Sequence, residues 1–142
     1  MLMPDVNVLV GAYRMDAPHH AELRKWLESA VNGTEALALT DSVLAGFVRV
    51  VTHPRVFVTP TPLDEALEQA ESVRAAAGVL RVTPAERHWQ IFADLCRRGS
   101  AKGNLVADAA HAATAIEAGA TWISLDRDFA RFPGLRWRSP LD

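Results

Sequence analysis

The sequence of 142 residues has one cysteine, two lysines and no long apolar run. Because Cys96 has no partner in the chain, a disulfide framework and a cysteine-based zinc site are excluded, and a reducing compartment is expected. No apolar stretch approaches the roughly 20 residues of a membrane span. No basic segment followed by an apolar run, typical of a secretion signal, opens the chain. We therefore expect a cytoplasmic protein without a membrane partner.

Several catalytic motifs are also missing from the sequence. It contains no G-x-G-x-x-G or G-x-x-x-x-G-K-[ST] phosphate-binding loop and no G-x-S-x-G nucleophile turn. Its five histidines are scattered and lack the H-E-x-x-H spacing of a zinc hydrolase. Dinucleotide-binding, Walker-type and serine-hydrolase functions are therefore disfavoured, as is a zinc site.

The composition that remains is typical of one globular domain. Hydrophobic residues make up 49% and charged residues 23%, and no repeat or linker divides the chain, so residues 1–142 are treated as one domain. The formal net charge of −2 gives no reason to expect nucleic acid. Arginine accounts for 13 of the 15 basic residues, which suits bidentate phosphate recognition, but a GC-rich genome would produce the same bias.

Short apolar segments alternate with segments of helical period, which predicts an α/β fold around a mostly parallel sheet. The expected strands end near residue 5 and cover 36–39, 79–82 and 121–125. Helices are expected after the first strand, over 18–32, 43–51 and 62–77, after residue 84, and over 105–118. The segment 53–62 contains three prolines and is expected to form a long exposed loop.

Four aspartates fall where these strands end or where a helix begins. Asp5 follows the first strand, Asp41 the second and Asp126 the last, while Asp108 lies in the first turn of a helix that Asn104 is expected to cap. Ligands of parallel α/β sheets bind beyond the carboxyl ends of the strands, so these acids are expected to cluster there. Two carboxylates about 4 Å apart repel by roughly 4 kcal/mol at an effective dielectric constant near 20. The cluster therefore predicts a hard divalent cation such as Mg²⁺, which prefers oxygen ligands.

Each acid also has a structural interpretation. Asp5 and Asp41 are candidate helix caps, and an acid at Asp108 would complement the helix dipole. Asp126 and Asp128 form a D-x-D pair, in which one side chain can point inward while the other caps the next turn. The tryptophans expected to pack in the core rather than stack on bases are Trp26, Trp89 and Trp122.

Four segments, in this order, carry a family pattern: Pro4–Leu9, Gly46–Phe57, Gly103–Ala109 and Ser124–Phe132. Together they resemble a PIN-domain ribonuclease, specifically a VapC toxin of the group common in mycobacteria, and the resemblance spans essentially the whole chain. It implies an α/β/α sandwich and an endoribonuclease that depends on Mg²⁺, with Mn²⁺ as a substitute. It also implies the toxin of a type II toxin–antitoxin pair, a homodimer that binds a cognate VapB antitoxin in a hetero-oligomer.

The resemblance implies a role for individual acids. Asp5, Asp108 and Asp126 match three of the family's acids and would act as metal ligands in the hydrolysis of an RNA phosphodiester. Supporting positions are expected at Asn7, Asn104 and Asp128.

The second acid of the family is where this sequence departs from the pattern. Local alignment puts that position at Gly46, and Asp41, five residues earlier, is expected to act in its place as a fourth catalytic residue. Asp5 and Asp108 would then hold the main ion, while Asp126 and Asp41 would bind a second ion or position the attacking water.

Two other functions share part of this pattern. A response-regulator-like receiver domain also places acids around Mg²⁺, but it needs an aspartate after its middle strand and a lysine after its last, where this chain has Thr83 and Asp126. A PIN-like module that binds RNA or a protein without cleaving stays open, because the second acid is missing. Measuring metal-dependent RNA cleavage beside RNA binding separates the module from the enzyme.

Overall fold

The computed structural model describes all 142 residues and contains one sheet of five strands. The strand order is β3-β2-β1-β4-β5, and every neighbouring pair is parallel, as the alternation of strands and helices predicted. The strands are β1 (Leu2–Pro4), β2 (Leu37–Leu39), β3 (Val79–Arg81), β4 (Thr121–Ile123) and β5 (Arg136–Arg138).

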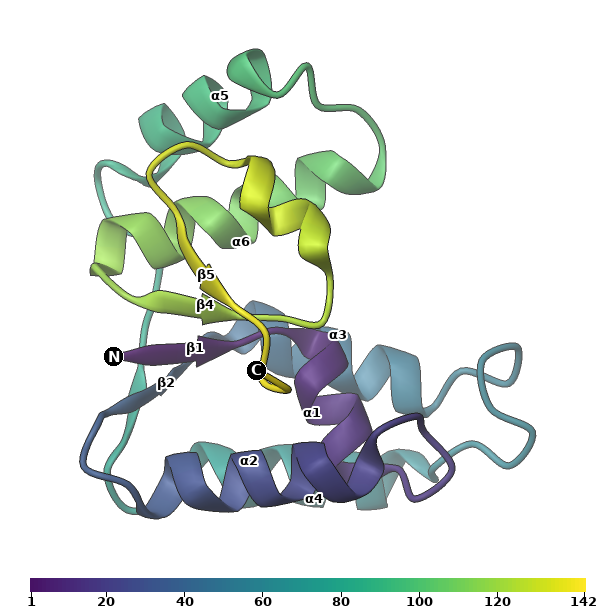
Figure 1. The fold of residues 1–142 in the computed structure, drawn as a ribbon. Coiled ribbons are helices and arrows are strands. Elements are labelled where there is room, and N and C mark those ends of the chain that lie inside the picture. Colours follow the sequence, from purple (N-terminus) through teal and green to yellow (C-terminus); the bar gives the residue numbers. More distant parts are fainter.

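Helices cover both sides of this sheet. Figure 1 shows α5 and α6 on one side and α2 and α4 on the other, which is the α/β/α sandwich that the resemblance implied. The helix α1 packs against α2 and α3, and α3 packs against α4. The helical elements are α1 (Val6–Tyr13), α2 (His20–Asn32), α3 (Asp41–Val51), α4 (Leu63–Arg74), α5 (His88–Arg98), α6 (Asn104–Ala118) and the 3₁₀ helix η1 (Arg127–Arg131).

The three central strands are buried almost throughout, as expected for parallel strands covered on both faces. Most of their side chains belong to a single cluster of 28 buried hydrophobic residues, in which Trp122 is the largest. The prediction that Trp89 packs in this core is wrong. Trp89 is 72% exposed, because α5 is an outer helix that packs on α6. None of the helices combines the length and apolar character needed to cross a bilayer.

Local capping differs from the sequence expectation at two helices. Thr40, not Asp41, caps α3, because its Oγ1 accepts a hydrogen bond from the Val43 N–H at 3.0 Å. Gly103, not Asn104, precedes α6, and its φ of +61° is a conformation that glycine adopts without strain. The strand β5 was not predicted, since two of its three residues are exposed arginines and it forms the edge of the sheet.

Candidate active site

The carboxyl ends of β1 and β4 lie side by side at the point where the strand order reverses. From β1 the chain adds β2 and β3 on one side, while β4 and β5 lie on the other. Pro4 is in register with Ile123, and the Asp5 N–H donates to the Ile123 carbonyl at 2.8 Å. The residues that follow, Asp5 and Ser124, therefore leave the sheet together. In α/β folds this reversal leaves a crevice in which ligands bind.

The carboxylate of Asp5 is held by three donors. Its Oδ1 accepts from the Val6 N–H at 2.7 Å, which caps α1. Its Oδ2 accepts from the Ser124 hydroxyl at 2.7 Å and from Asn7 Nδ2 at 3.3 Å. Asp5 is only 8% exposed, so its orientation is fixed by these contacts.

Ser124 is a site residue that the sequence analysis missed. Its hydroxyl is fully buried, donates to Asp5, and accepts from the Asp126 N–H at 3.0 Å and from Asn7 Nδ2 at 3.1 Å. The amide of Asn7 in turn accepts from the Leu125 N–H at 3.2 Å. The sequence did contain a signal for Ser124, because it is a polar residue directly after the apolar strand and two residues before Asp126.

Asp126 and Asp108 reach the same cavity from two other elements. Asp126 follows β4 and caps η1, where its Oδ1 accepts from the Asp128 N–H at 2.9 Å. Asp108 lies in the second turn of α6. With Asp5 they line a cavity of about 660 Å³, which contains no lysine, arginine or histidine. The other residues that line it are Val6, Asn7, Val10, Gly11, Asp16, Ala17, Pro18, Val50, Val56, Phe57, Val58 and Leu125.

The pKa values of Asp5 and Asp108 are both raised. Burial raises the pKa of Asp5, the charge of Asp126 adds to the effect, and the hydrogen bonds from Ser124 and Val6 oppose it. Burial also raises the pKa of Asp108, and the negative charges of Asp5 and Asp126 raise it further. The charge of Asp126 thus acts on both of the other carboxylates, which places the three in one environment.

His111 lies near Asp108, and its charge lowers the pKa of that acid without cancelling the rise. Burial lowers the pKa of His111, and the charge of Asp108 only partly offsets this effect. Its ring stacks on Trp122 with 5.3 Å between the ring centroids. The imidazole is therefore held against the core as a neutral group.

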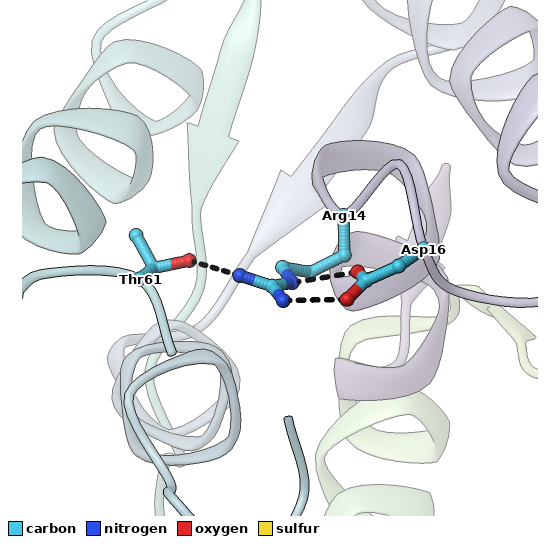
Figure 2. Close-up of polar contacts among 3 residues, drawn as sticks. All are labelled: Arg14, Asp16 and Thr61. Atoms are coloured by element: carbon cyan, nitrogen blue, oxygen red, sulfur yellow. Dashed lines mark hydrogen bonds and ion pairs between the residues drawn. The ribbon is translucent and has the colours of Figure 1, made fainter. Parts of the chain in front are cut away.

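A fourth carboxylate at the cavity, Asp16, differs from the others because it has a cationic partner. Figure 2 shows the Arg14 guanidinium lying between Asp16 and Thr61. Arg14 donates to both oxygens of Asp16, at 3.0 and 2.7 Å, and this pairing lowers the Asp16 pKa. Asp16 is therefore already neutralised, whereas Asp5, Asp108 and Asp126 are not.

The donor chemistry of these three acids fits a hard divalent cation. Carboxylate oxygens are the ligands that Mg²⁺ and Mn²⁺ prefer, and a cation would relieve the mutual repulsion. As they lie, however, no three acidic, histidine or cysteine side chains converge closely enough to form a complete metal site. An ion at this position must complete its coordination with water or after small side-chain rotations, and Mg²⁺ commonly keeps several waters.

The structure does not bring Asp41 to this cavity. Asp41 is exposed at the start of α3, and its Oδ1 accepts from Arg74 Nε on α4 at 3.2 Å. It lines a separate groove between α3 and α4 with Leu44 and Leu67. Two of the supporting positions, Asn104 and Asp128, are exposed and do not line the acidic cavity.

Gly46 lies where α3 packs against α1. A Cβ atom built at this position would lie 2.7 Å from the Cγ2 atom of Val6, closer than real contacts allow. The close approach of the two helices therefore excludes a larger side chain here unless Val6 moves.

Comparison with known proteins gives consistent matches along the chain. The family model of the PIN domain matches residues 2–135. VapC ribonuclease Mb2897 of Mycobacterium bovis is 52% identical over 142 residues, covering all of this chain and 97% of that protein. Ribonuclease VapC25 of Mycobacterium tuberculosis is 36% identical over 140 residues, covering 99% of both. The structure of VapBC2 from Rickettsia felis, bound to a DNA fragment from its promoter, has the same fold, with a TM-score of 0.71, 16% identity and 97% of each chain covered.

Proposed function

The chain belongs to the PIN-domain family, among the VapC ribonuclease toxins, and from this premise we propose that Asp5, Asp108 and Asp126 hold the divalent cation with which it cleaves RNA. The observation that carries the proposal is the cavity in which these three carboxylates meet without any cationic side chain. We assign Mg²⁺ as the ion, with Mn²⁺ as a substitute, because all three ligands are hard oxygens.

The chain's own residues prepare the site for this chemistry. Ser124 and the Val6 N–H donate to Asp5, which favours its charged form and fixes the direction of its oxygens. The Asp128 N–H donates to Asp126 and fixes the direction of its carboxylate. When bound, the ion supplies positive charge to the phosphate and lowers the pKa of a coordinated water.

Asp41 has no part in this proposal. Its carboxylate pairs with Arg74 in a different groove, so it does not substitute for the missing second acid from that position. The catalytic set is thus three acids, with Asn7 and Ser124 orienting Asp5.

We also infer the partners from the relatives. The structure from Rickettsia felis is of a VapBC pair, so we propose that a VapB-type antitoxin holds this chain inactive. We propose that it acts on RNA in the cytoplasm, as a single domain of residues 1–142 and as a homodimer. VapC20 of Mycobacterium tuberculosis is described as cleaving the sarcin–ricin loop, and which RNA this chain cuts is settled by mapping its products.

The test is cleavage of total RNA by the purified protein with Mg²⁺, with Mn²⁺ and with a chelator, followed by sequencing of the new RNA ends. We expect cleavage at defined sites with either ion and none with the chelator. RNA binding in Mg²⁺ without new ends would instead support the non-catalytic module. Cleavage that persists in the chelator would contradict the metal role of the three acids.

A further inference from the structure

The loop 53–62, which joins α3 to α4, forms one wall of the acidic cavity. Its tip residues Val56, Phe57 and Val58 line the cavity together with Asp5 and Asp108. None of the proposed metal ligands lies on this loop. The position of the loop therefore depends on its own contacts with the rest of the chain.

Backbone hydrogen bonds tie the two ends of this loop to α3, whereas the tip is bonded only within the loop, where the N–H groups of Val56 and Phe57 donate to the His53 carbonyl at 3.1 and 3.2 Å. The His53 N–H donates to Val50 at 3.1 Å and the Thr61 N–H donates to Val51 at 2.8 Å, which ties both ends to α3. At the tip, Val56 and Val58 are 53% and 101% exposed, and only Phe57 between them is partly buried.

Phe57 is held by Arg14. The guanidinium carbon lies 4.0 Å from the centroid of the Phe57 ring, a cation–π geometry. The same group donates through Nη1 to Thr61 Oγ1 at 3.1 Å and makes two bonds to Asp16 (Figure 2). Arg14 therefore joins the end of α1 to both the tip and the far end of the loop, and its side chain is only 13% exposed.

A second cavity, of about 360 Å³, is lined by Arg14 and Asp16 together with the far end of the loop, Thr59 to Pro62. Asp16 lines both cavities, whereas the loop tip lines only the acidic one. The Arg14–Asp16 pair therefore lies next to both the acidic cavity and the far end of the loop.

We propose that Arg14 is a positioning residue, which holds the loop 53–62 as the wall against which RNA binds beside the acidic site. This inference rests on the proposed function. The loop also carries the exposed Arg55, whose positive charge suits an RNA phosphate flanking the cleaved bond. Contacts of this kind, remote from the reacting phosphate, are made equally in the ground and transition states, so they determine KM rather than kcat.

A merely structural role for Arg14 makes a different prediction. If Arg14 only stabilised the fold, its loss would lower the free energy of unfolding of the whole chain and would not act on one loop. The matched control is Arg24, which also lies over an aromatic ring, that of Tyr13 at 5.3 Å, and bonds a carboxylate, Glu28, at 2.9 Å. Arg24 lies on α2 and does not line the acidic cavity.

The experiment compares Arg14→Gln with Arg24→Gln in two measurements: steady-state RNA cleavage, and hydrogen exchange of the peptide that spans 53–62. For Arg14→Gln we expect KM to rise on the order of tenfold, equivalent to about 1.4 kcal/mol, with kcat within about twofold. Exchange in the loop should be on the order of tenfold faster. Arg24→Gln should match the wild type in both. Arg14→Lys keeps the charge but offers one nitrogen where Arg14 uses three, so it cannot reproduce the paired bonds to Asp16 together with the bond to Thr61, and its KM and loop exchange should fall between those of the wild type and Arg14→Gln.

Phe57→Leu provides a second variant that leaves the Arg14–Asp16 pair intact and changes only a loop side chain. It should also raise KM and loop exchange. Unchanged exchange and KM in both Arg14→Gln and Phe57→Leu would overturn the proposal, as would equal effects in Arg14→Gln and Arg24→Gln. If the wild type cleaves no RNA, the proposed function fails, while the exchange measurement still shows whether Arg14 holds the loop.

Discussion

Two aspartates follow neighbouring parallel strands and have opposite surroundings. Asp5 follows β1, is 8% exposed, and has only uncharged hydrogen-bond donors. Asp41 follows β2 after a single residue, is exposed, and pairs with Arg74. An acid after a parallel strand is therefore not sufficient to identify a site.

The difference follows from what lies beside each strand end. The strand next to β1 is β4, at the point where the strand order reverses. The turn after β4 places Ser124 and Asp126 beside Asp5. Beyond β2 is β3, and α4 there supplies a cation instead of an acid. The reversal point concentrates negative charge, whereas the adjacent strand end neutralises it.

The largest expected effect that tests this comparison is the loss of activity in Asp5→Asn. Removing a ligand of the catalytic ion costs several kcal/mol of transition-state stabilisation, which corresponds to a fall in kcat/KM on the order of 10³-fold. The matched variant Asp41→Asn should stay within about twofold of the wild type. Both are measured as initial rates of RNA cleavage in Mg²⁺. Equal losses in the two variants would remove the distinction between the two strand ends.

A smaller loss is expected in Ser124→Ala. Without the hydroxyl, Asp5 loses one of its donors and the Asp126 N–H loses its acceptor, so the ligands are less well oriented. Loss of an outer-shell partner typically reduces metal affinity or activity by about 10- to 100-fold. Titration of activity with Mg²⁺ measures this, and Ser72→Ala, on the exposed face of α4, is the control. A Mg²⁺ dependence unchanged from the wild type would show that Ser124 serves packing alone.

The stability of the metal-free protein should depend on pH with a defined sign. Asp5 and Asp108 have a raised pKa in the folded state, so between the ordinary value of 3.8 and the raised value the folded chain binds more protons than the unfolded chain. The free energy of unfolding should therefore fall as pH rises through this window. Urea titrations from pH 4 to 7 in chelator measure the slope, which added Mg²⁺ should reduce.

Asp108→Asn should lower RNA cleavage but raise the stability of the metal-free protein. It removes one of the repelling charges, so at neutral pH in chelator the variant should be more stable than the wild type by on the order of 1 kcal/mol. The gain should disappear in Mg²⁺, where the wild type is stabilised by the ion. A variant less stable than the wild type in chelator would mean that the Asp108 carboxylate contributes a favourable contact.

The smallest effect is expected at the second strand end. Arg74→Gln removes the exposed pair with Asp41, and such pairs contribute less than about 1 kcal/mol. RNA cleavage should be unchanged, and the free energy of unfolding should fall slightly at low salt and not at high salt. A loss of cleavage without a loss of stability would connect the groove between α3 and α4 to the catalytic site.

The sequence predicted four of the five strands and the helices, because short apolar runs and helix-period segments alternate clearly. It did not predict β5, because two of the three residues of this strand are arginines and it lacks an apolar run. It also did not predict the exposure of Trp89, which follows from the packing of α5 on the outer side of α6. These features are set by tertiary packing, which local periodicity does not report.

The candidate site could be predicted where it depends on topology. The structure brings Asp5, Asp108 and Asp126 to one cavity, and their role as ligands remains a prediction. Asp41 is neutralised by Arg74, which lies 33 residues later in the chain. Ser124 contacts Asp5 because β1 and β4 pair in register, although they are about 120 residues apart. Neither relation is visible in local sequence.

The contact between Gly46 and Val6 limits how this site can change. Because a Cβ at Gly46 would overlap the Val6 side chain, a single substitution at Gly46 cannot add a fourth acid without displacing that side chain. Val6 directly follows Asp5, so displacing it would move the first ligand as well. We therefore expect Gly46→Glu to be tolerated best when Val6 is changed to alanine before it or together with it.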